Sequence, residues 1–228
     1  SARGKACSTL FILITGTKPT FSIFSLDHKT PSLTLLIGYL IGSVPFALVV
    51  GKLFYKVDIR EHGSGNLGGT NAGRTLGAKA GIAVAILDVL KASIAMLIVQ
   101  LFAPNAIIFA GFFATIGHCY PIFANFKGGK AVSTAAGFLL AISLMITGNF
   151  LLHFLLPVAL FFVVLYFTKM VSLSAMLMLC LATAILYISK VDLSISGTFT
   201  IITLIVIYRH KDNIKRIRDG NENKITWM

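Results

Sequence analysis

The stretch AGIAVAILDVLKASIAMLIVQLF, residues 80–102, decides the class of fold. Asp88 and Lys91 are its only charged residues, and most of the others are apolar. A helix needs ~20 apolar residues to cross the hydrocarbon core of a bilayer, and this stretch is long enough. The whole chain of 228 residues is similar: 56% of it is hydrophobic, 12% is charged, and its mean hydropathy is +0.86. These values predict an integral membrane protein.

The apolar stretches divide into seven expected transmembrane helices. Gly148 and Asn149 interrupt the run over 131–168, which is nearly twice the length of one crossing, so we divide it into two spans. Small residues recur along the spans and predict close helix packing, as at Gly38, Gly42 and Ala135–Gly137. The predicted fold is all-α, with helices over about 33–54, 80–102, 105–124, 131–148, 151–168, 170–189 and 191–208.

Basic residues are distributed unequally between the connections. The chain has 20 Lys and Arg against 8 Asp and Glu, a formal charge of +12, which fits cytoplasmic loops against anionic membrane lipids better than a nucleic-acid partner. One side of the bundle holds only Lys190, so the other side is predicted to be cytoplasmic, with the N-terminus outside and the C-terminus inside. The cytoplasmic side then carries Lys56, Arg60, Arg74, Lys79, Lys127, Lys130, Lys169 and the basic tail from Arg209 to Lys224.

Residues 1–31 do not fit this scheme. They begin without Met, and their apolar stretch is too short to cross a membrane because Thr17–Pro19 interrupts it. We expect an N-terminal extension, a leader or an expression remnant without an assigned role. Residues 32–228 are expected to form a single transmembrane domain.

Three polar segments are predicted to emerge on the cytoplasmic face. They are GSGNLGGTNAGRTLG (Gly63–Gly77), GHCYPIFANFKGGKAVST (Gly117–Thr134) and YRHKDNIKRIRDGNENKI (Tyr208–Ile225). Glycine lets backbone N–H groups surround an anion, Lys and Arg add charge, and the second segment also opens a helix. Either loop alone could be a simple turn or a topology signal, but the convergence of all three favours phosphate binding.

Several common phosphate and metal motifs are absent from this sequence. A Walker A motif would need glycine at Ala124 and a hydroxyl residue at Ala131. The first glycine segment follows a membrane helix rather than a strand, which excludes the dinucleotide-binding context. Asp58 and Glu61 are the only carboxylates near it, and His118 beside Cys119 lacks further ligands, so no metal site is expected.

The tail is expected to form a helix beginning near Tyr208 and stopping at Gly220. On such a helix His210, Asn213, Ile214 and Ile217 share one face. That face could cover one side of the phosphate site. Glu222, which follows the expected end of the helix at Gly220, could pair with a cation of one of the loops. The alternative is an amphipathic anchor on acidic lipid.

The three segments together resemble the membrane-integral acyl-phosphate:glycerol-3-phosphate acyltransferases of bacteria, the PlsY family. The resemblance covers about residues 33–225, and its motifs occur in the family's order. They are Ser64–Asn71 with Arg74, Gly117-His118 with Phe126–Lys130, and Arg209–Ile214. Members have seven transmembrane helices with these motifs on the cytoplasmic side.

The resemblance implies transfer of a fatty acyl group from acyl phosphate to the 1-hydroxyl of glycerol 3-phosphate, which gives lysophosphatidic acid and phosphate. It also implies the bacterial inner membrane, no cofactor, membrane lipids as surroundings and a soluble acyl-phosphate synthase upstream. Other glycerophosphate acyltransferases use a His followed five residues later by Asp, and none of the five histidines here has that partner. A transporter of a phosphorylated solute and a lipid-binding scaffold are the competing functions. A transporter would need polar residues near the midplane on broken, repeated helices, whereas here the polar groups gather on one face and no internal repeat is evident.

The resemblance also assigns residues to roles. His210 and Asn213 would lie beside the reacting hydroxyl, with Ser64 as a further catalytic candidate and Glu222 in support. The family usually has glycine where this chain has Ala131, and we expect that change to keep activity. The residues expected to bind or shape the sites for phosphate are Ser64, Asn66, Gly68, Thr70, Asn71, Arg74, Lys127, Gly128, Gly129 and Lys130.

Asp88 and Lys91 stand three residues apart inside a predicted span. An unpaired charge at the bilayer centre would cost ~3 kcal/mol or more, so we expect the two to pair. Their depth in the membrane favours a structural ion pair over a role with a water-soluble phosphate.

Overall fold

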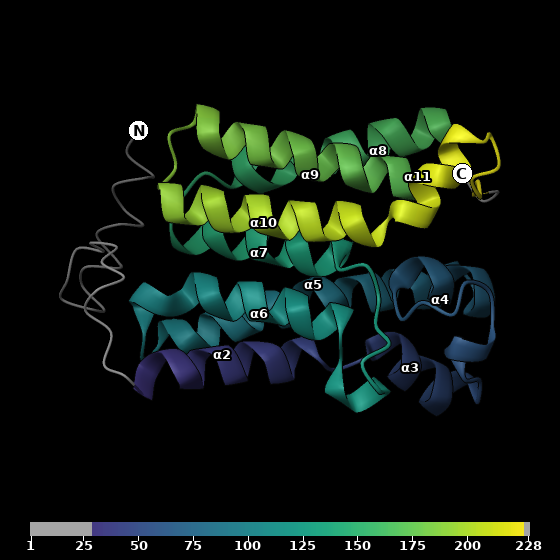
Figure 1. The fold of residues 1–228 in the computed structure, drawn as a ribbon, viewed down its shortest axis with the longest axis horizontal. Coiled ribbons are helices and arrows are strands. Elements are labelled where there is room, and N and C mark those ends of the chain that lie inside the picture. Colours follow the sequence, from purple (N-terminus) through teal and green to yellow (C-terminus); the bar gives the residue numbers. More distant parts are fainter. Residues whose placement is uncertain (1–28, 226–228) are drawn as a thin grey trace.

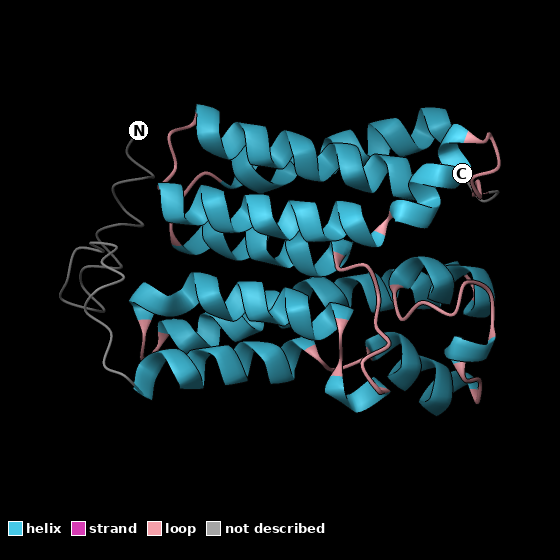
Figure 2. Ribbon diagram, viewed as in Figure 1, coloured by secondary structure: helices cyan, strands magenta, loops and turns pink. Residues whose placement is uncertain are grey.

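The computed structural model describes residues 29–225, and every regular element within them is a helix (Figure 2). Most of the expected N-terminal extension, residues 1–28, lies outside the described residues, as do residues 226–228. The helices are α2 (Lys29–Gly42), α3 (Phe46–Val50), α4 (Gly69–Leu76), α5 (Ala78–Gln100), α6 (Ile107–Cys119), α7 (Val132–Met145), α8 (Leu156–Thr168), α9 (Val171–Ile188), α10 (Leu193–Arg209) and α11 (Lys211–Arg218).

The long helices lie side by side along the longest direction of the molecule, and α4 and α11 lie at one end (Figure 1). Five helical stretches among residues 29–225 are long and apolar enough to cross a membrane, or six if α10 and α11 form one bent span. α7 is apolar but has only 14 residues. The all-helical membrane fold is therefore confirmed, while seven crossings and the orientation of the termini stay predictions.

The first expected span, 33–54, is interrupted. α2 ends at Gly42, α3 begins after Pro45, and a π-helical turn then runs from Gly51 to Tyr55. Proline has no N–H group to continue the helical hydrogen bonds, which accounts for a break at this point. The expected division of 131–168 is confirmed, because α7 ends at Met145 and the next helical stretch begins at Leu151.

Small residues bring the helices close together, as predicted. α2 packs on α6, and a Cβ atom at Gly42 would lie only 2.2 Å from the carbonyl oxygen of Ala114. α5 packs on α7, where a Cβ atom at Gly137 would lie 2.1 Å from the carbonyl oxygen of Val89. This packing brings the start of α7 and the end of α6 to the same end of the bundle as α4.

Candidate active site

A cavity of about 720 Å³ opens at this end of the bundle, and all three polar segments line it. The predicted convergence is thus confirmed for most of the candidate residues. Lys127 and Gly128 do not line the cavity: the Lys127 side chain is exposed, and Gly128 is buried. The predicted residues that do line it are Ser64, Asn66, Gly68, Thr70, Asn71, Arg74, Gly129, Lys130, His210, Asn213 and Glu222.

Residues 63–68, the first loop, are held by the buried side chain of Asn71. Its Oδ1 accepts a hydrogen bond from the backbone N–H of Ser64 at 2.9 Å. Its amide donates to the carbonyl oxygens of Ile59 at 3.2 Å and His62 at 3.1 Å. Asn66 adds a bond from its amide to Ser64 Oγ at 3.1 Å. The Asn71 side chain therefore ties the first loop to the residues that precede it.

The second half of the first glycine segment is helical rather than a loop. α4 begins at Gly69, with Gly68 as its cap residue. The N–H groups of a first helical turn have no partner within the helix and favour an anion. Gly68, Gly69 and Thr70 all line the cavity, so this helix start belongs to the site.

Residues 125–131, the second loop, are held from α10. The guanidinium of Arg209 donates to the carbonyl oxygen of Gly129 at 3.0 Å and to that of Gly128 at 3.2 Å. The same guanidinium lies 5.3 Å from the centre of the Tyr120 ring. The sequence places Arg209 in the basic tail and at the start of the tail motif but does not predict this contact, because no local pattern connects residues 80 positions apart.

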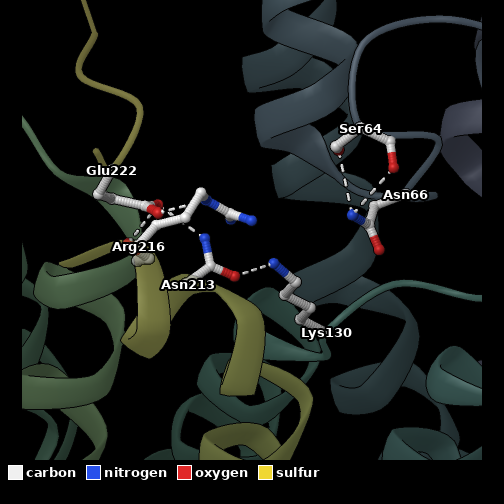
Figure 3. A network of polar contacts seen from close by, with 7 residues as sticks. Ser64, Asn66, Lys130, Asn213, Arg216 and Glu222 are labelled. Atoms are coloured by element: carbon white, nitrogen blue, oxygen red, sulfur yellow. Dashed lines mark hydrogen bonds and ion pairs between the residues drawn. The ribbon is translucent and has the colours of Figure 1, made fainter. Parts of the chain in front are cut away.

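A chain of polar contacts joins the second loop to the tail (Figure 3). The ammonium of Lys130 donates to Asn213 Oδ1. The Asn213 amide donates to Glu222 Oε1 at 2.7 Å, and Arg216 Nε donates to Glu222 Oε2 at 2.9 Å. Ser172 Oγ, on α9, completes the group with a bond to Glu222 Oε1 at 2.8 Å. Glu222 thus pairs with Arg216 of its own segment and reaches the loop cation only through Asn213, unlike the direct pairing expected.

Burial and these contacts change the pKa values of the group. Burial lowers the pKa of Lys130, and the nearby positive charge of Arg216 lowers it further. Burial alone would raise the pKa of Glu222, but hydrogen bonds from Asn213, Ser172 and Arg216 hold it below its ordinary value. Glu222 is therefore a negatively charged carboxylate, and it holds the positive charge of Arg216 at the cavity wall.

His210 lies where the tail bends. α10 and α11 meet there at 58°, so the expected tail helix begins at Lys211 rather than near Tyr208, and it ends at Arg218, just before Gly220, whose φ is +72°. Burial lowers the pKa of His210 to about 4, although the hydrogen bond between its Nδ1 and the Val206 carbonyl oxygen, at 2.7 Å, opposes this. At neutral pH the ring is uncharged, and its Nδ1–H donates to that carbonyl. Nε2 is then left as a hydrogen-bond acceptor.

The predicted face of the tail is only partly correct. His210 and Asn213 are buried and line the cavity, whereas Ile214 is 42% exposed. The bend separates His210 from the α11 residues, so helical spacing counted from Tyr208 does not describe the observed faces.

The expected pair of Asp88 and Lys91 is confirmed, with Oδ1 and Nζ 2.8 Å apart. The expectation that its depth separates it from the site is wrong, because Asp88 and the adjacent His118 also line the cavity. His118 Nδ1 lies 2.8 Å from Lys91 Nζ. Within residues 29–225 there is no group of three His, Cys, Asp or Glu side chains that could hold a metal ion.

These features define a helical integral membrane protein whose cationic, amide-lined cavity suits an anionic ligand. A family model described as glycerol-3-phosphate acyltransferase matches residues 32–220. The chain belongs to this family, and specifically to its membrane-integral PlsY type, as similarity to solved PlsY structures shows.

The relatives are similar over nearly their full length. The glycerol-3-phosphate acyltransferase of Bacillus subtilis (strain 168) is 47% identical over 198 residues, which are 86% of this chain and 98% of that protein. The enzyme of the same name from Geobacillus kaustophilus (strain HTA426) is 44% identical over 197 residues, 86% and 96% of the two chains. The crystal structure of PlsY (YgiH) in its glycerol 3-phosphate form is 32% identical, with a TM-score of 0.77 over 86% of this chain and 96% of that one. Its lysophosphatidic acid form gives a TM-score of 0.76.

Proposed function

We propose that this protein transfers a fatty acyl group from acyl phosphate to the 1-hydroxyl of glycerol 3-phosphate, giving lysophosphatidic acid and inorganic phosphate. The observation that carries the proposal is the single cavity in which the first loop, Lys130 and the tail residues His210 and Asn213 meet. The forms in which PlsY (YgiH) was crystallised support the acceptor and the product.

The cavity has the mixed character that these substrates need. Arg74, Lys130 and the start of α4 offer positive charge and N–H groups to phosphate, and Ser64 adds a hydroxyl. Phe161, Val171 and Ala175 line the same cavity and offer an apolar wall to the acyl chain. A phosphate end and a lipid end can therefore be bound in one place.

The reaction requires alignment of the hydroxyl with the carbonyl carbon and stabilisation of the developing negative charge more than it requires a strong base. In an acyl phosphate the carbonyl carbon is already activated by the phosphate leaving group. The glycerol hydroxyl oxygen attacks this carbon, the bond from carbon to the phosphate oxygen breaks, and the hydroxyl proton passes to a phosphate oxygen. Loop cations and N–H groups stabilise the charge that develops on the carbonyl and phosphate oxygens.

His210 has a positioning role in this scheme. With a pKa of about 4, it is a weak base at neutral pH. Its Nδ1–H is engaged by Val206, so Nε2 can accept a hydrogen bond from the glycerol hydroxyl and orient its oxygen. Asn213, held between Lys130 and Glu222, is a second group for orienting the acceptor.

We further propose seven transmembrane crossings, with the N-terminus outside and the cavity on the cytoplasmic face of the bacterial inner membrane. The unequal distribution of basic residues supports this orientation. A soluble acyl-phosphate synthase would supply the donor from the same side, and the chemistry assigned to these residues uses no cofactor.

The test is phosphate release by protein purified in mild detergent. Palmitoyl phosphate is supplied with and without glycerol 3-phosphate, and lysophosphatidic acid is measured in parallel. We expect release that depends on the acceptor and is lost in folded Arg74→Ala and Lys130→Ala variants. Folded wild-type protein that is inactive with both palmitoyl phosphate and palmitoyl-CoA would contradict the proposal, and glycerol 3-phosphate uptake into proteoliposomes would then test transport.

A further inference from the structure

A buried polar cluster between α5 and α6 has no role in the proposed chemistry. Asp88, Lys91 and His118 are only 1%, 2% and 6% exposed. The Lys91 ammonium lies 2.8 Å from Asp88 Oδ1 and 2.8 Å from His118 Nδ1, and it donates to the carbonyl oxygen of Val44 at 3.1 Å. The ammonium therefore has three polar neighbours, a carboxylate oxygen, a ring nitrogen and a carbonyl oxygen. Ionised side chains inside a membrane are costly and are typically kept for function.

The cluster determines which ring nitrogen of His118 carries the proton. A lysine ammonium can only donate, so His118 Nδ1 accepts from Lys91. The proton of the neutral imidazole then lies on Nε2. Asp88 holds the Lys91 ammonium beside the ring, so the ion pair fixes both the tautomer and the orientation of the imidazole.

The Nε2 edge of this ring lies directly against the second loop. A Cβ atom at Gly129 would be 2.2 Å from His118 Nε2, so the imidazole occupies the space where a side chain would be. The backbone N–H of Gly129 also donates to the carbonyl oxygen of His118 at 3.1 Å. His118 thus contacts Gly129 through both its side chain and its backbone.

Gly129 is the residue before Lys130, and its carbonyl oxygen is held from the other side by Arg209. With His118 on one side and Arg209 on the other, the peptide leading into Lys130 has little freedom. A small displacement of this peptide would move the Lys130 ammonium and the loop N–H groups relative to a bound phosphate.

We propose that Asp88, Lys91 and His118 act as positioning residues that fix the second loop for binding the phosphate of glycerol 3-phosphate. They act through Gly129 and Lys130 and do not take part in the bonds that form and break. This inference rests on the proposed function for its substrate, but its structural part concerns the loop alone.

The experiment compares two variants with a matched control. His118→Asn keeps an amide near Nδ1 for Lys91 but withdraws the ring from Gly129. The double variant Asp88→Asn/Lys91→Met removes both charges at similar volume, without leaving an unpaired buried ion. Thr183→Val removes a hydroxyl that lies 3.0 Å from Thr203 Oγ1 between α9 and α10, and Thr183 does not line the cavity.

Two measurements are made on each folded protein. Hydrogen–deuterium exchange of peptides over residues 125–133 reports on the loop without requiring turnover. Steady-state kinetics separate the KM for glycerol 3-phosphate from kcat. In the two site variants we expect loop exchange roughly tenfold faster, a KM roughly tenfold higher and a kcat within about threefold of the wild type. Thr183→Val should match the wild type in all three quantities.

Two results would overturn the proposal. Unchanged loop exchange in folded His118→Asn would mean that the cluster serves only helix packing. A fall in kcat as large as that of Lys130→Ala, at unchanged KM, would place His118 on the reacting atoms instead. If the double variant does not fold, His118→Asn decides the matter. If the wild type has no acyltransferase activity, the exchange data still test the loop, so the two failures are distinguishable.

Discussion

The first loop, residues 63–68, and the second loop, residues 125–131, face one cavity but are ordered by different means. In the first loop, Gly63 and Gly65 adopt positive φ angles of +59° and +67°, and nearby Asn71 supplies the hydrogen bonds. In the second loop the positive φ angles belong to Asn125, Phe126 and Ala131 instead.

The glycines of the second loop therefore serve another purpose. Gly128 and Gly129 are buried against His118, where no side chain would fit. Glycine in the first loop supplies the positive φ angles, whereas glycine in the second loop lets His118 approach the backbone closely. The first arrangement is local in sequence, and the second depends on α6, α10 and the tail.

The largest expected effect comes from removing the cation that the second loop presents. Lys130→Ala should lower kcat/KM for acyl transfer roughly 10²–10³-fold, because one preorganised group that stabilises developing charge is lost. Lys127→Ala is the matched control, since that exposed lysine lies outside the cavity, and it should stay within about twofold of the wild type. Equal losses in both variants would mean that total loop charge matters rather than the position of Lys130.

The next largest effect tests whether the second loop depends on the close approach of Gly129 to His118. Gly129→Ala would place a methyl group 2.2 Å from His118 Nε2 and 2.9 Å from the Leu67 carbonyl oxygen, so the loop must shift. We expect activity to fall about 100-fold, because a displacement near 1 Å in a binding group can cost that much. Gly197→Ala, which meets no atom within 4 Å, should keep full activity. A fully active Gly129→Ala protein would show that the second loop is more adaptable than its packing indicates.

The first loop is tested by Asn71→Ala. This change removes the acceptor for the Ser64 N–H and leaves the Ile59 and His62 carbonyl oxygens without their partner. Thermal unfolding in detergent should show a loss of about 2 kcal/mol, and activity should fall as the loop loosens. Asn66→Ala, which loses bonds only to Ser64, should cost under about 1 kcal/mol. Similar losses in the two proteins would show that Asn71 is not the main support of this loop.

The smallest effect concerns the alanine at the start of α7. Ala131 has a φ of +60°, a conformation that costs an L-residue ~1 kcal/mol or more. Ala131→Gly should relieve this cost, but part of the gain is offset by the greater freedom of glycine in the unfolded chain. The net expectation is a stability increase of about 0.5 kcal/mol with activity retained. Ala135→Gly, inside α7, should instead lose about 1 kcal/mol.

Much of the fold could be predicted because hydropathy is a local property. The span expected over 80–102 is α5, Ala78–Gln100, and the span expected over 170–189 is α9, Val171–Ile188. The helix α4 was missed because glycine-rich sequence resembles a loop. The bend at His210 was missed because the residues around it have no helix-breaking signal.

The sequence by itself determined the membrane class, most helix limits and the three polar segments, since these depend on composition and short motifs. Only the tertiary structure decided that Arg209 holds Gly128 and Gly129, that Ser172 supports Glu222, and that His118 lies against the second loop. The Arg209 and Ser172 contacts join residues 50 or more positions apart, and the His118 contact depends on a turn of the chain that helical periodicity does not describe. They form because close helix packing brings chain segments together, and no periodicity within one segment records its neighbour.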